Sequence, residues 1–395
     1  MSDSESMTEW RNGASALDSP PTGCVPRHDP ERGTPRPTGG TILTRKDTIT
    51  FTVTIAAVIC AAAAKFLGAT AVVQFVAAAA ALSLLAMNVS AGTEHAGEHM
   101  GPGATGVLQA ALGNLPEVLV CAFALRAGLL QVVQAALVGS ILANSLLVLG
   151  AAILVGGLKH GRLRFHAESP RMIASLMMLA VTALVIPTLA AELHTPAAEH
   201  EGALGAACAI LLLVVFVASL PFSLSSDPDR TVRHAVKPAP HDAWPLWLAV
   251  TVLVVASLGA ALVSEWFVSA LEPAIETLHI SQAFAGIVVV AIAGNAVENV
   301  AGIRLAAKNR PDYAMSVILN SSLVIALCVV PALVLLSFVL GGVVLTLVMP
   351  PLLIAALLLT TLTSAIIVND GETIWLEGVA LIGLYCIIAA AFWWG

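Results

Sequence analysis

Apolar segments of about 20 residues follow one another along most of this chain, with short polar stretches between them. An α-helix needs about 20 apolar residues to cross the roughly 30 Å of bilayer hydrocarbon, so this succession predicts a membrane protein with many spans. The spans are expected at about 49–66, 71–89, 104–126, 131–156, 171–190, 203–222, 245–265, 282–304, 313–338, 342–363 and 374–393. The predicted fold class is an all-α polytopic membrane protein with about 11 transmembrane helices.

The composition supports a membrane location. Hydrophobic residues make up 58% of the 395 residues, charged residues make up 11%, and the mean hydropathy is +0.91, which excludes an ordinary soluble domain. The net charge of −7 is not gathered in a basic face, so nucleic acid is not an expected partner. Six cysteines lie far apart without metal-ligand spacing, and we interpret them as small buried apolar residues.

The distribution of lysine and arginine predicts the orientation, because cytoplasmic loops retain these residues during insertion. When the spans alternate from a cytoplasmic N-terminus, 16 of the 18 basic residues fall inside, and only Lys65 and Arg126 lie near the outer face. The predicted topology is N-terminus inside and C-terminus outside. The short loops and the alanine-rich composition favour a bacterial plasma membrane.

The two halves of the chain carry matching sequences. Gly113 to Glu117 (GNLPE) matches Gly294 to Glu298 (GNAVE) at an offset of 298 − 117 = 181, which we call the repeat offset, and the same offset aligns Ser140 with Ser321. The span around Glu117 runs outward and the span around Glu298 runs inward, so the halves are predicted to be inverted repeats. The predicted parts are a disordered cytoplasmic tail (1–48), an extra helix (49–70), the first five-helix repeat (71–222), a cytoplasmic linker (223–244) and the second five-helix repeat (245–395).

Glu117 and Glu298 are the candidate ion-binding residues. A carboxylate at the bilayer centre costs at least about 2.5 kcal/mol, so it persists where it faces a cavity or a partner. Glycine and asparagine precede each glutamate, and Pro116 adjoins the first, so both helices are expected to break there and expose carbonyl oxygens. With the amides of Asn114 and Asn295, these oxygens form the environment that a hard cation such as Ca²⁺ prefers.

The same two carboxylates are expected to bind protons, because their mutual repulsion and their removal from water both favour protonation. Metal and protons would then compete for one pair, which is the minimum requirement for antiport. Two other interpretations remain. The glutamates can pack helices together through hydrogen bonds, or they can form the selectivity ring of a passive cation channel. No enzyme activity and no resident cofactor are predicted.

The two glutamate motifs resemble the signature repeats of the cation/proton exchangers, and specifically the calcium/proton antiporter (CAX) branch of the cation/calcium exchanger superfamily. The resemblance covers roughly residues 49–393. Further similar patterns are Thr93-Glu94, Gly101-Pro102, Gly139-Ser140 with Asn144, Asp370-Gly371-Glu372 and Trp375 to Gly378.

The resemblance implies an eleven-helix fold and proton-driven Ca²⁺ export, with Glu117 and Glu298 as shared metal and proton ligands. The residues expected to support the site are Gly113, Gly294, Ser140, Ser321, Asn299 and Asn320. Asn299 stands where the family commonly has histidine, Asn320 where it usually has glycine, and Val324 where it often has glutamine. Exchange of Na⁺ or K⁺ for protons therefore stays open beside exchange of Ca²⁺.

Two weaker signals remain. His95 to His99 (HAGEH) fits the H-x-x-E-H pattern of zinc hydrolases, but it is expected in a short cytoplasmic link and has no evident third ligand. A cytoplasmic entrance that attracts cations through Glu94 and Glu98, or plain solvation of the loop, are the alternatives. Glu265, Glu272, Glu276 and His279 are expected at the outer ends of two spans, where they release cations or face water.

Overall fold

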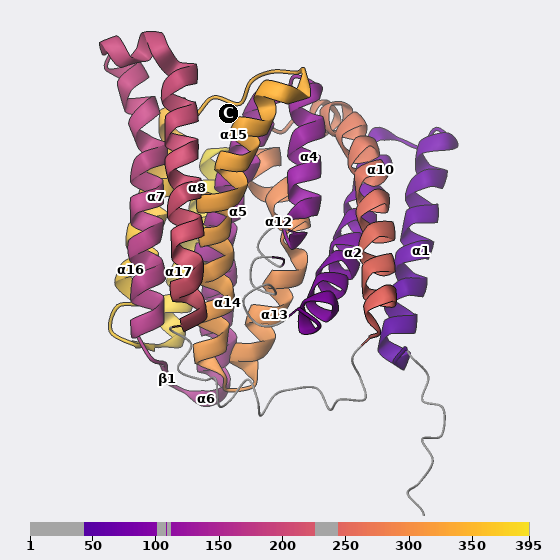
Figure 1. Cartoon of the computed structure of the whole chain (residues 1–395), viewed down its shortest axis with the longest axis horizontal. Coiled ribbons are helices and arrows are strands. Elements are labelled where there is room, and N and C mark those ends of the chain that lie inside the picture. Colours follow the sequence, from indigo (N-terminus) through magenta and orange to yellow (C-terminus); the bar gives the residue numbers. More distant parts are fainter. Residues whose placement is uncertain (1–42, 101–107, 109–111, 226–243, 395) are drawn as a thin grey trace, which may run out of the picture. The chain divides into compact units, whose positions relative to one another are not determined.

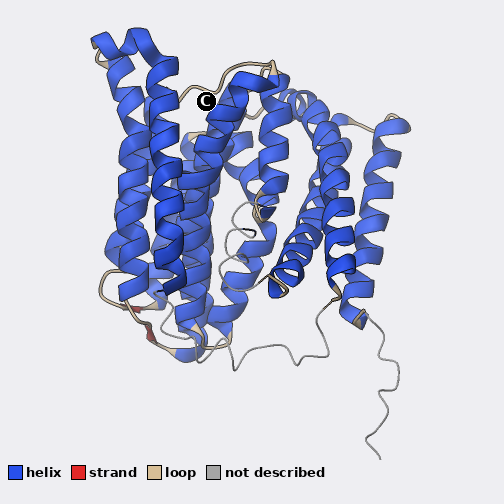
Figure 2. Cartoon of the chain, in the orientation of Figure 1, coloured by secondary structure: helices blue, strands red, loops and turns tan. Residues whose placement is uncertain are grey.

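The computed structural model describes residues 43–100, 108, 112–225 and 244–394, and not the side chains of 221–225 and 296–298 (Figure 1). This part is almost entirely helical (Figure 2). The first half contains α1 (Arg45–Phe66), α2 (Ala71–Glu98), α4 (Leu115–Arg126), α5 (Leu130–Leu142), η1 (Ala143–Val148), α6 (Leu149–His160), α7 (Glu168–Glu192), η2 (Pro196–His200) and α8 (Glu201–Ser225). The second half contains α10 (Leu246–Leu278), α11 (Gln282–Phe284), η3 (Ala285–Val290), α12 (Ala291–Gly294), α13 (Ala296–Ala307), α14 (Pro311–Val324), η4 (Ile325–Val329), α15 (Val330–Leu340), α16 (Pro351–Ile367) and α17 (Trp375–Ala391).

The prediction of an all-α polytopic membrane protein is confirmed. Within the described ranges, seven helices or helix series are long and apolar enough to cross a membrane, and the bent series from Gln282 to Ala307 raises the number to eight. Two shorter apolar helices, α16 and α17, occupy the last two predicted spans. The total of 11 spans stays a prediction, since residues 101–107 and 109–111 lie outside the description. The predicted tail up to residue 42 and most of the linker, 226–243, also lie outside it.

Several predicted boundaries were wrong. Helix α2 continues past the predicted end at 89 and reaches Glu98, because the hydrophilic residues after 89 still form regular helical turns beyond the apolar core. Helix α10 likewise continues to Leu278. Conversely, α16 begins at Pro351 rather than at 342, because Pro350 and Pro351 set the start of the helix.

Residues 341–350 instead form an extended segment between α15 and α16. Gly341 ends α15 in the left-handed conformation (φ 71°), which glycine adopts without strain. The buried side-chain amide of Gln134 on α5 donates to the carbonyls of Thr346 and Val348, each at 2.9 Å. The hydroxyl of Thr188 on α7 donates to the same segment, so its non-helical backbone is bonded inside the protein rather than exposed to lipid.

The inverted repeats share local backbone features. Asn114, which precedes α4, has φ −94° and ψ 10°, and Asn295, which precedes α13, has φ −105° and ψ 14°. The π-helical turns η1 and η4 also occupy positions that the repeat offset aligns. Such turns are frequent at functional sites. The helix breaks that the Gly-Asn pairs predict are therefore present, and the break in the second half bends the helix by 64°.

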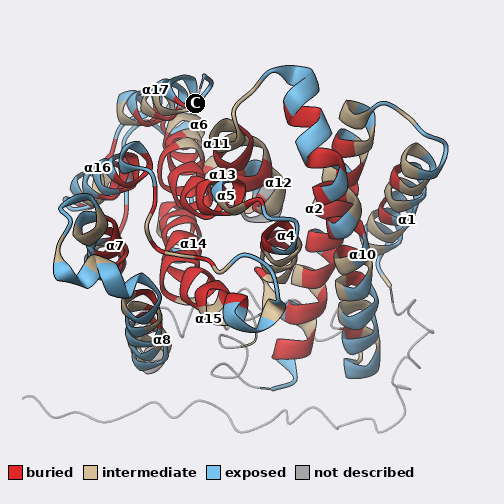
Figure 3. Ribbon diagram, turned by 90° about the horizontal axis from the view of Figure 1, so that it is seen from above, coloured by how far each residue is buried: buried red, intermediate tan, exposed pale blue. Residues whose placement is uncertain are grey.

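Small residues allow the central helices to cross closely. A Cβ atom on Gly139 of α5 would lie 2.7 Å from the carbonyl oxygen of Ile287 in η3, and one on Gly286 would lie 2.7 Å from the carbonyl oxygen of Val132. Close backbone approach through glycine is the usual packing mode between membrane helices. Figure 3 shows α5 and α14 as the most buried helices, whereas α1 and α8 expose much of their surface.

The cysteine prediction was only partly right. Cys121 is buried, but Cys60 on α1 and Cys386 on α17 are exposed on the surface of the described bundle. A membrane helix can turn an apolar residue toward lipid, which is as apolar as the protein core, so an apolar side chain need not be buried by other helices. Cys24 lies outside the described residues.

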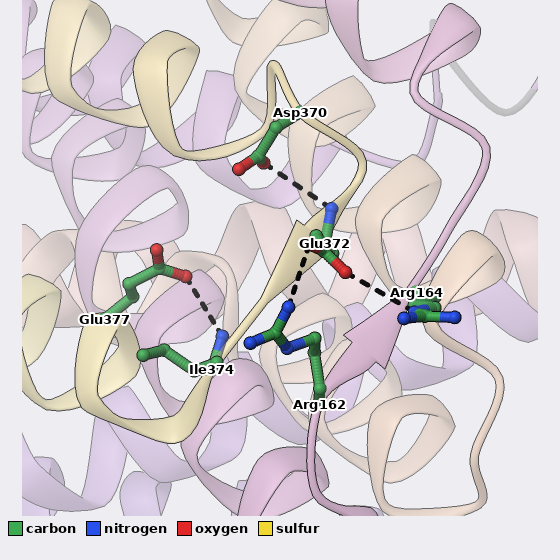
Figure 4. A network of polar contacts seen from close by, with 6 residues as sticks. All are labelled: Arg162, Arg164, Asp370, Glu372, Ile374 and Glu377. Carbon is green, nitrogen blue, oxygen red and sulfur yellow. Dashed lines mark hydrogen bonds and ion pairs between the residues drawn. The ribbon is translucent and has the colours of Figure 1, made fainter.

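One end of the bundle carries most of the described basic residues, and we call it the basic end. Here strand β1 (Leu163–Arg164) of the first repeat pairs antiparallel with β2 (Glu372–Thr373) of the second. Figure 4 shows Glu372 between Arg162, at 3.0 Å, and Arg164, at 3.4 Å. In the same view Glu377 accepts a hydrogen bond from the backbone N–H of Ile374 and caps α17. The residues around Glu372, which resemble a family pattern, thus contact the first repeat through β1.

Candidate functional site

The first glutamate motif lies where α4 begins. Gly113 and Asn114 form a turn, and the carbonyl of Asn114 accepts the N–H of Val118 at 3.1 Å, which starts the helix. Pro116 occupies the first turn, where its missing N–H costs nothing. Glu117 follows in the same turn and is only 5% exposed. The partial positive charge of the helix N-terminus stabilises a carboxylate at this position.

A hydrogen-bonded chain links Glu117 to the second repeat. The hydroxyl of Ser140 on α5 donates to Oε1 of Glu117. The side-chain amide of Asn295 donates to Ser140 Oγ at 2.9 Å and to the carbonyl of Ala291 at 3.0 Å. Gly294 lies against this glutamate, because a Cβ atom there would be 3.8 Å from Glu117 Cβ. The two Gly-Asn motifs, far apart in the sequence, therefore meet at one buried point.

A second pair of polar contacts lies one helical turn beyond Ser140, in η1. The amide of Asn144 donates to Ser321 Oγ on α14 at 2.9 Å, and Ser145 Oγ lies 3.1 Å from Ser322 Oγ. All four side chains are buried. Both contacts join the two repeats, so the centre of the bundle is held by hydroxyl and amide groups rather than by apolar packing alone.

The second glutamate lies on α13, but the side chain of Glu298 is outside the described residues. Asn299 follows it, and its buried Oδ1 accepts no hydrogen bond from the part of the chain that the structure describes. Asn320 on α14 is exposed, although its repeat equivalent Gly139 is buried. Asn320 therefore does not join the hydrogen-bonded chain of Glu117, and its predicted role at the site stays a prediction.

The structure thus brings together Glu117, Ser140, Gly294 and Asn295, with Asn114 buried beside them at the start of α4. The sequence analysis missed Ser145 and Ser322. These serines have no serine at the equivalent position of the other repeat, so the repeat search had no signal for them. In the described residues, no group of three or more His, Cys, Asp or Glu side chains is arranged to hold a metal. The groups that do converge are the carboxylate of Glu117, the hydroxyl of Ser140 and the side-chain amide of Asn295, and carboxylate and hydroxyl oxygens suit a hard cation.

Comparison with known proteins now identifies the family. The model of the family described as sodium/calcium exchanger protein matches residues 70–225 and 248–394, one stretch in each half of the chain. The chain belongs to the sodium/calcium exchanger family.

Relatives of this exchanger include the Ca²⁺/H⁺ antiporter of Synechocystis sp., which is 34% identical over 353 residues, 84% of this chain and 93% of the relative. The Ca²⁺/H⁺ antiporter ChaA of Bacillus subtilis is 32% identical over 314 residues, 78% of this chain and 88% of the relative. The solved structure of native YfkE superposes with a TM-score of 0.74 at 30% identity, covering 87% of this chain and 99% of YfkE. These matches confirm the predicted resemblance to calcium/proton exchangers.

The H-x-x-E-H motif of this exchanger was predicted in a short link between helices. It lies instead at the C-terminal end of α2, because this helix extends to Glu98. The ring of His95 stacks on Trp244 with 4.4 Å between centroids. His99 Nε2 lies 2.9 Å from the carbonyl oxygen of Trp244. Both histidines therefore contact the segment that precedes α10, which gives the motif a packing role at the basic end.

A cavity of about 350 Å³ lies at the other end of α4, away from Glu117. Glu265 and Glu272 of α10 line it together with Arg126 of α4. Both glutamates lie on α10, which continues to Leu278, and their place at the outer end of the span stays a prediction. All three side chains are exposed, so solvent screens their charges.

Proposed function

We propose that this exchanger is a calcium/proton antiporter that exports cytoplasmic Ca²⁺ in exchange for H⁺ by alternating access. Relatives that carry this name match most of the length of the chain. The observation that carries the proposal is the hydrogen-bonded chain from Glu117 through Ser140 to Asn295, because it joins the motifs of both repeats at a buried point. A central site between inverted repeats is the arrangement on which alternating access depends.

In this mechanism Glu117 and Glu298 bind Ca²⁺ when deprotonated, and each binds a proton when Ca²⁺ has left. Ser140 holds one oxygen of Glu117, and Asn295 holds Ser140, so the first carboxylate keeps one orientation in both forms. The carbonyl oxygens near the breaks at Asn114 and Asn295 would complete the coordination. An empty, doubly charged site is costly within the bilayer, so the carrier would cross only when loaded with metal or protons.

The orientation is also part of the proposal. The basic end carries Lys159, Arg162, Arg164 and Arg171, and the opposite end has Lys65 and Arg126. The excess of positive charge supports a cytoplasmic basic end in a bacterial plasma membrane. With this orientation, Ca²⁺ enters from the basic end and protons enter from the end that contains Glu265 and Glu272.

Everted vesicles test the proposal directly. Vesicles with an imposed proton gradient receive Ca²⁺, Na⁺ or K⁺ in turn, while a pH-sensitive dye reports the gradient. Ca²⁺ should dissipate the gradient, with saturation at increasing Ca²⁺ concentration. If only Na⁺ or K⁺ dissipates the gradient, the transported cation is monovalent and the calcium proposal is wrong. Cation flux that follows the membrane voltage without proton movement would indicate a channel instead.

A further inference from the structure

Two serines on the long helices α2 and α10 occupy equivalent positions in the repeats. Ser83 and Ser264 are separated by the repeat offset, the one that relates Glu117 to Glu298. Two nearby positions agree as well, since Ala79 and Ala80 align with Ala260 and Ala261. Helices α2 and α10 pack side by side, as Figures 1 and 3 both show.

The two serines make different contacts although their positions match. The hydroxyl of Ser83 lies within hydrogen-bond distance of two carbonyl oxygens, 2.9 Å from that of Ala79 in its own helix and 3.0 Å from that of Ala293, which lies just before Asn295 and thus at the break that carries the second glutamate. Ser264 is fully buried, with 0% exposure, and its hydroxyl bonds to none of the residues that the structure describes. Buried hydroxyls are rarely left without a partner, so this asymmetry requires an explanation.

The repeat offset also indicates which carbonyl would be the equivalent acceptor for Ser264. The repeat offset aligns Ala293 with Leu112, which precedes the break at Asn114 as Ala293 precedes the break at Asn295. A helical carbonyl normally accepts the N–H four positions later, but Pro116 occupies that position and has no N–H. The carbonyl of Leu112 therefore lacks the N–H donor that an unbroken helix would supply.

We propose that Ser83 and Ser264 are positioning residues. Each serine holds the broken helix of the other repeat, and each does so in only one of the two transport states. In the state described here Ser83 holds the break of the second repeat. In the opposite state, Ser264 donates to the carbonyl of Leu112, and Ser83 releases Ala293. The inference rests on the proposed alternating access, in which inverted repeats exchange their conformations.

This arrangement makes the protein bistable. Each state leaves one of the two serines without its interhelical bond, so neither state satisfies both. A hydrogen bond that forms in only one state shifts the equilibrium toward that state. Ser83→Ala should therefore disfavour the described state, and Ser264→Ala should disfavour the opposite one.

Spin-label distances measure the two populations. Labels at Glu94→Cys on α2 and Leu158→Cys on α6 report on the basic end, in a reconstituted variant whose native cysteines are replaced by alanine. Loss of one buried hydrogen bond should change the ratio of the two populations by about three- to tenfold. The change should have opposite signs in Ser83→Ala and Ser264→Ala, and the double variant should return toward the parent ratio. Ser83→Thr, which keeps the hydroxyl, should also restore it.

Equal shifts in the same direction, or no shift in either variant, would overturn the alternation. Simple destabilisation of the fold would lower the folded yield of both variants without producing opposite population shifts. If the parent exchanges Ca²⁺ for H⁺ and the populations do not shift, antiport stands and the serine alternation is wrong. If the opposite shifts occur in a protein that exchanges another cation, the alternation stands and the calcium proposal is wrong.

Discussion

The side-chain amide of Asn295 in the second repeat lies 2.9 Å from Ser140 Oγ in the first, and donates its hydrogen bond to the hydroxyl that in turn donates to Glu117. A carboxylate of one repeat is therefore oriented by an amide of the other. The first Gly-Asn motif leads into Glu117 and the second supplies Asn295, so residues of both motifs meet in one buried cluster.

Replacement of Ser140 by alanine should impair exchange strongly. The change removes the hydroxyl that donates to Glu117 and takes from the amide of Asn295 one of its two acceptors, the other being the carbonyl of Ala291, so the carboxylate loses a bond that orients it. A loss of about tenfold in the initial rate is expected for one buried charge-assisted hydrogen bond. The rate is measured as Ca²⁺-driven dissipation of a proton gradient in everted vesicles.

Ser337→Ala provides the matched control. Ser337 is also buried, and its hydroxyl accepts the N–H of Leu345, far along the chain from the Glu117 cluster. Ser337→Ala should lose about as much stability as Ser140→Ala, but its exchange rate should stay within about twofold of that of the parent. Equal loss of exchange in the two variants would show that Ser140 acts only through stability.

The polar pair at Asn144 is expected to matter in the same way. Asn144→Leu keeps the approximate volume but removes the donor to Ser321, and leaves that buried hydroxyl with one bond fewer. We expect about tenfold slower exchange. Ser145→Ala breaks the neighbouring contact to Ser322 and should slow exchange by less than about threefold, because neither serine has a serine at the equivalent position of the other repeat, whereas Ser321 is the equivalent of Ser140. The reverse order of effects would contradict this assignment.

Much of the fold could be predicted because membrane helices follow simple rules. The apolar runs located the spans, and the Gly-Asn pairs with Pro116 located the helix break at Asn114. The second Gly-Asn pair likewise located the break at Asn295, whose backbone dihedral angles are similar to those of Asn114. These features depend on local sequence and on the cost of placing polar groups in lipid.

The remaining features depend on contacts between distant segments. The extended segment at 341–350 is apolar enough to be read as a span, and its non-helical backbone is bonded by side chains from other helices, among them the amide of Gln134 and the hydroxyls of Thr188 and Ser337. The asymmetry between Ser83 and Ser264 is likewise invisible in a sequence where the two positions are identical. The ion-binding role of Glu298 stays a prediction.

The crossing of α5 and η3 predicts a position that tolerates only glycine. Gly139→Ala would place a methyl group against the backbone of Ile287, which cannot move as a side chain can. The expected loss of stability is about 2 kcal/mol, measured as a lower Tm of the purified protein. Gly202→Ala on α8 is the control, because nothing lies within 4 Å of the added methyl group, and it should keep the Tm or raise it slightly. Similar Tm losses in both variants would refute the close crossing.

His95→Ala separates packing from zinc binding. The variant loses the aromatic contact with Trp244, worth about 1 kcal/mol, and should keep at least about half of the exchange rate. Metal analysis of the purified parent and variant should give the same zinc content. Stoichiometric zinc in the parent that disappears in the variant would instead support the hydrolase interpretation of the H-x-x-E-H motif.

The central claim is that Glu117 and Glu298 form one site for both calcium and protons. Glutamine keeps the size of the side chain but cannot release a proton, so Glu117→Gln and Glu298→Gln test it without a change of volume. Glu192→Gln at the exposed end of α7 is the matched control and should retain exchange. In everted vesicles, each of the two site variants should fold normally and show no Ca²⁺-driven dissipation of the proton gradient. Full exchange by either variant would contradict the shared site.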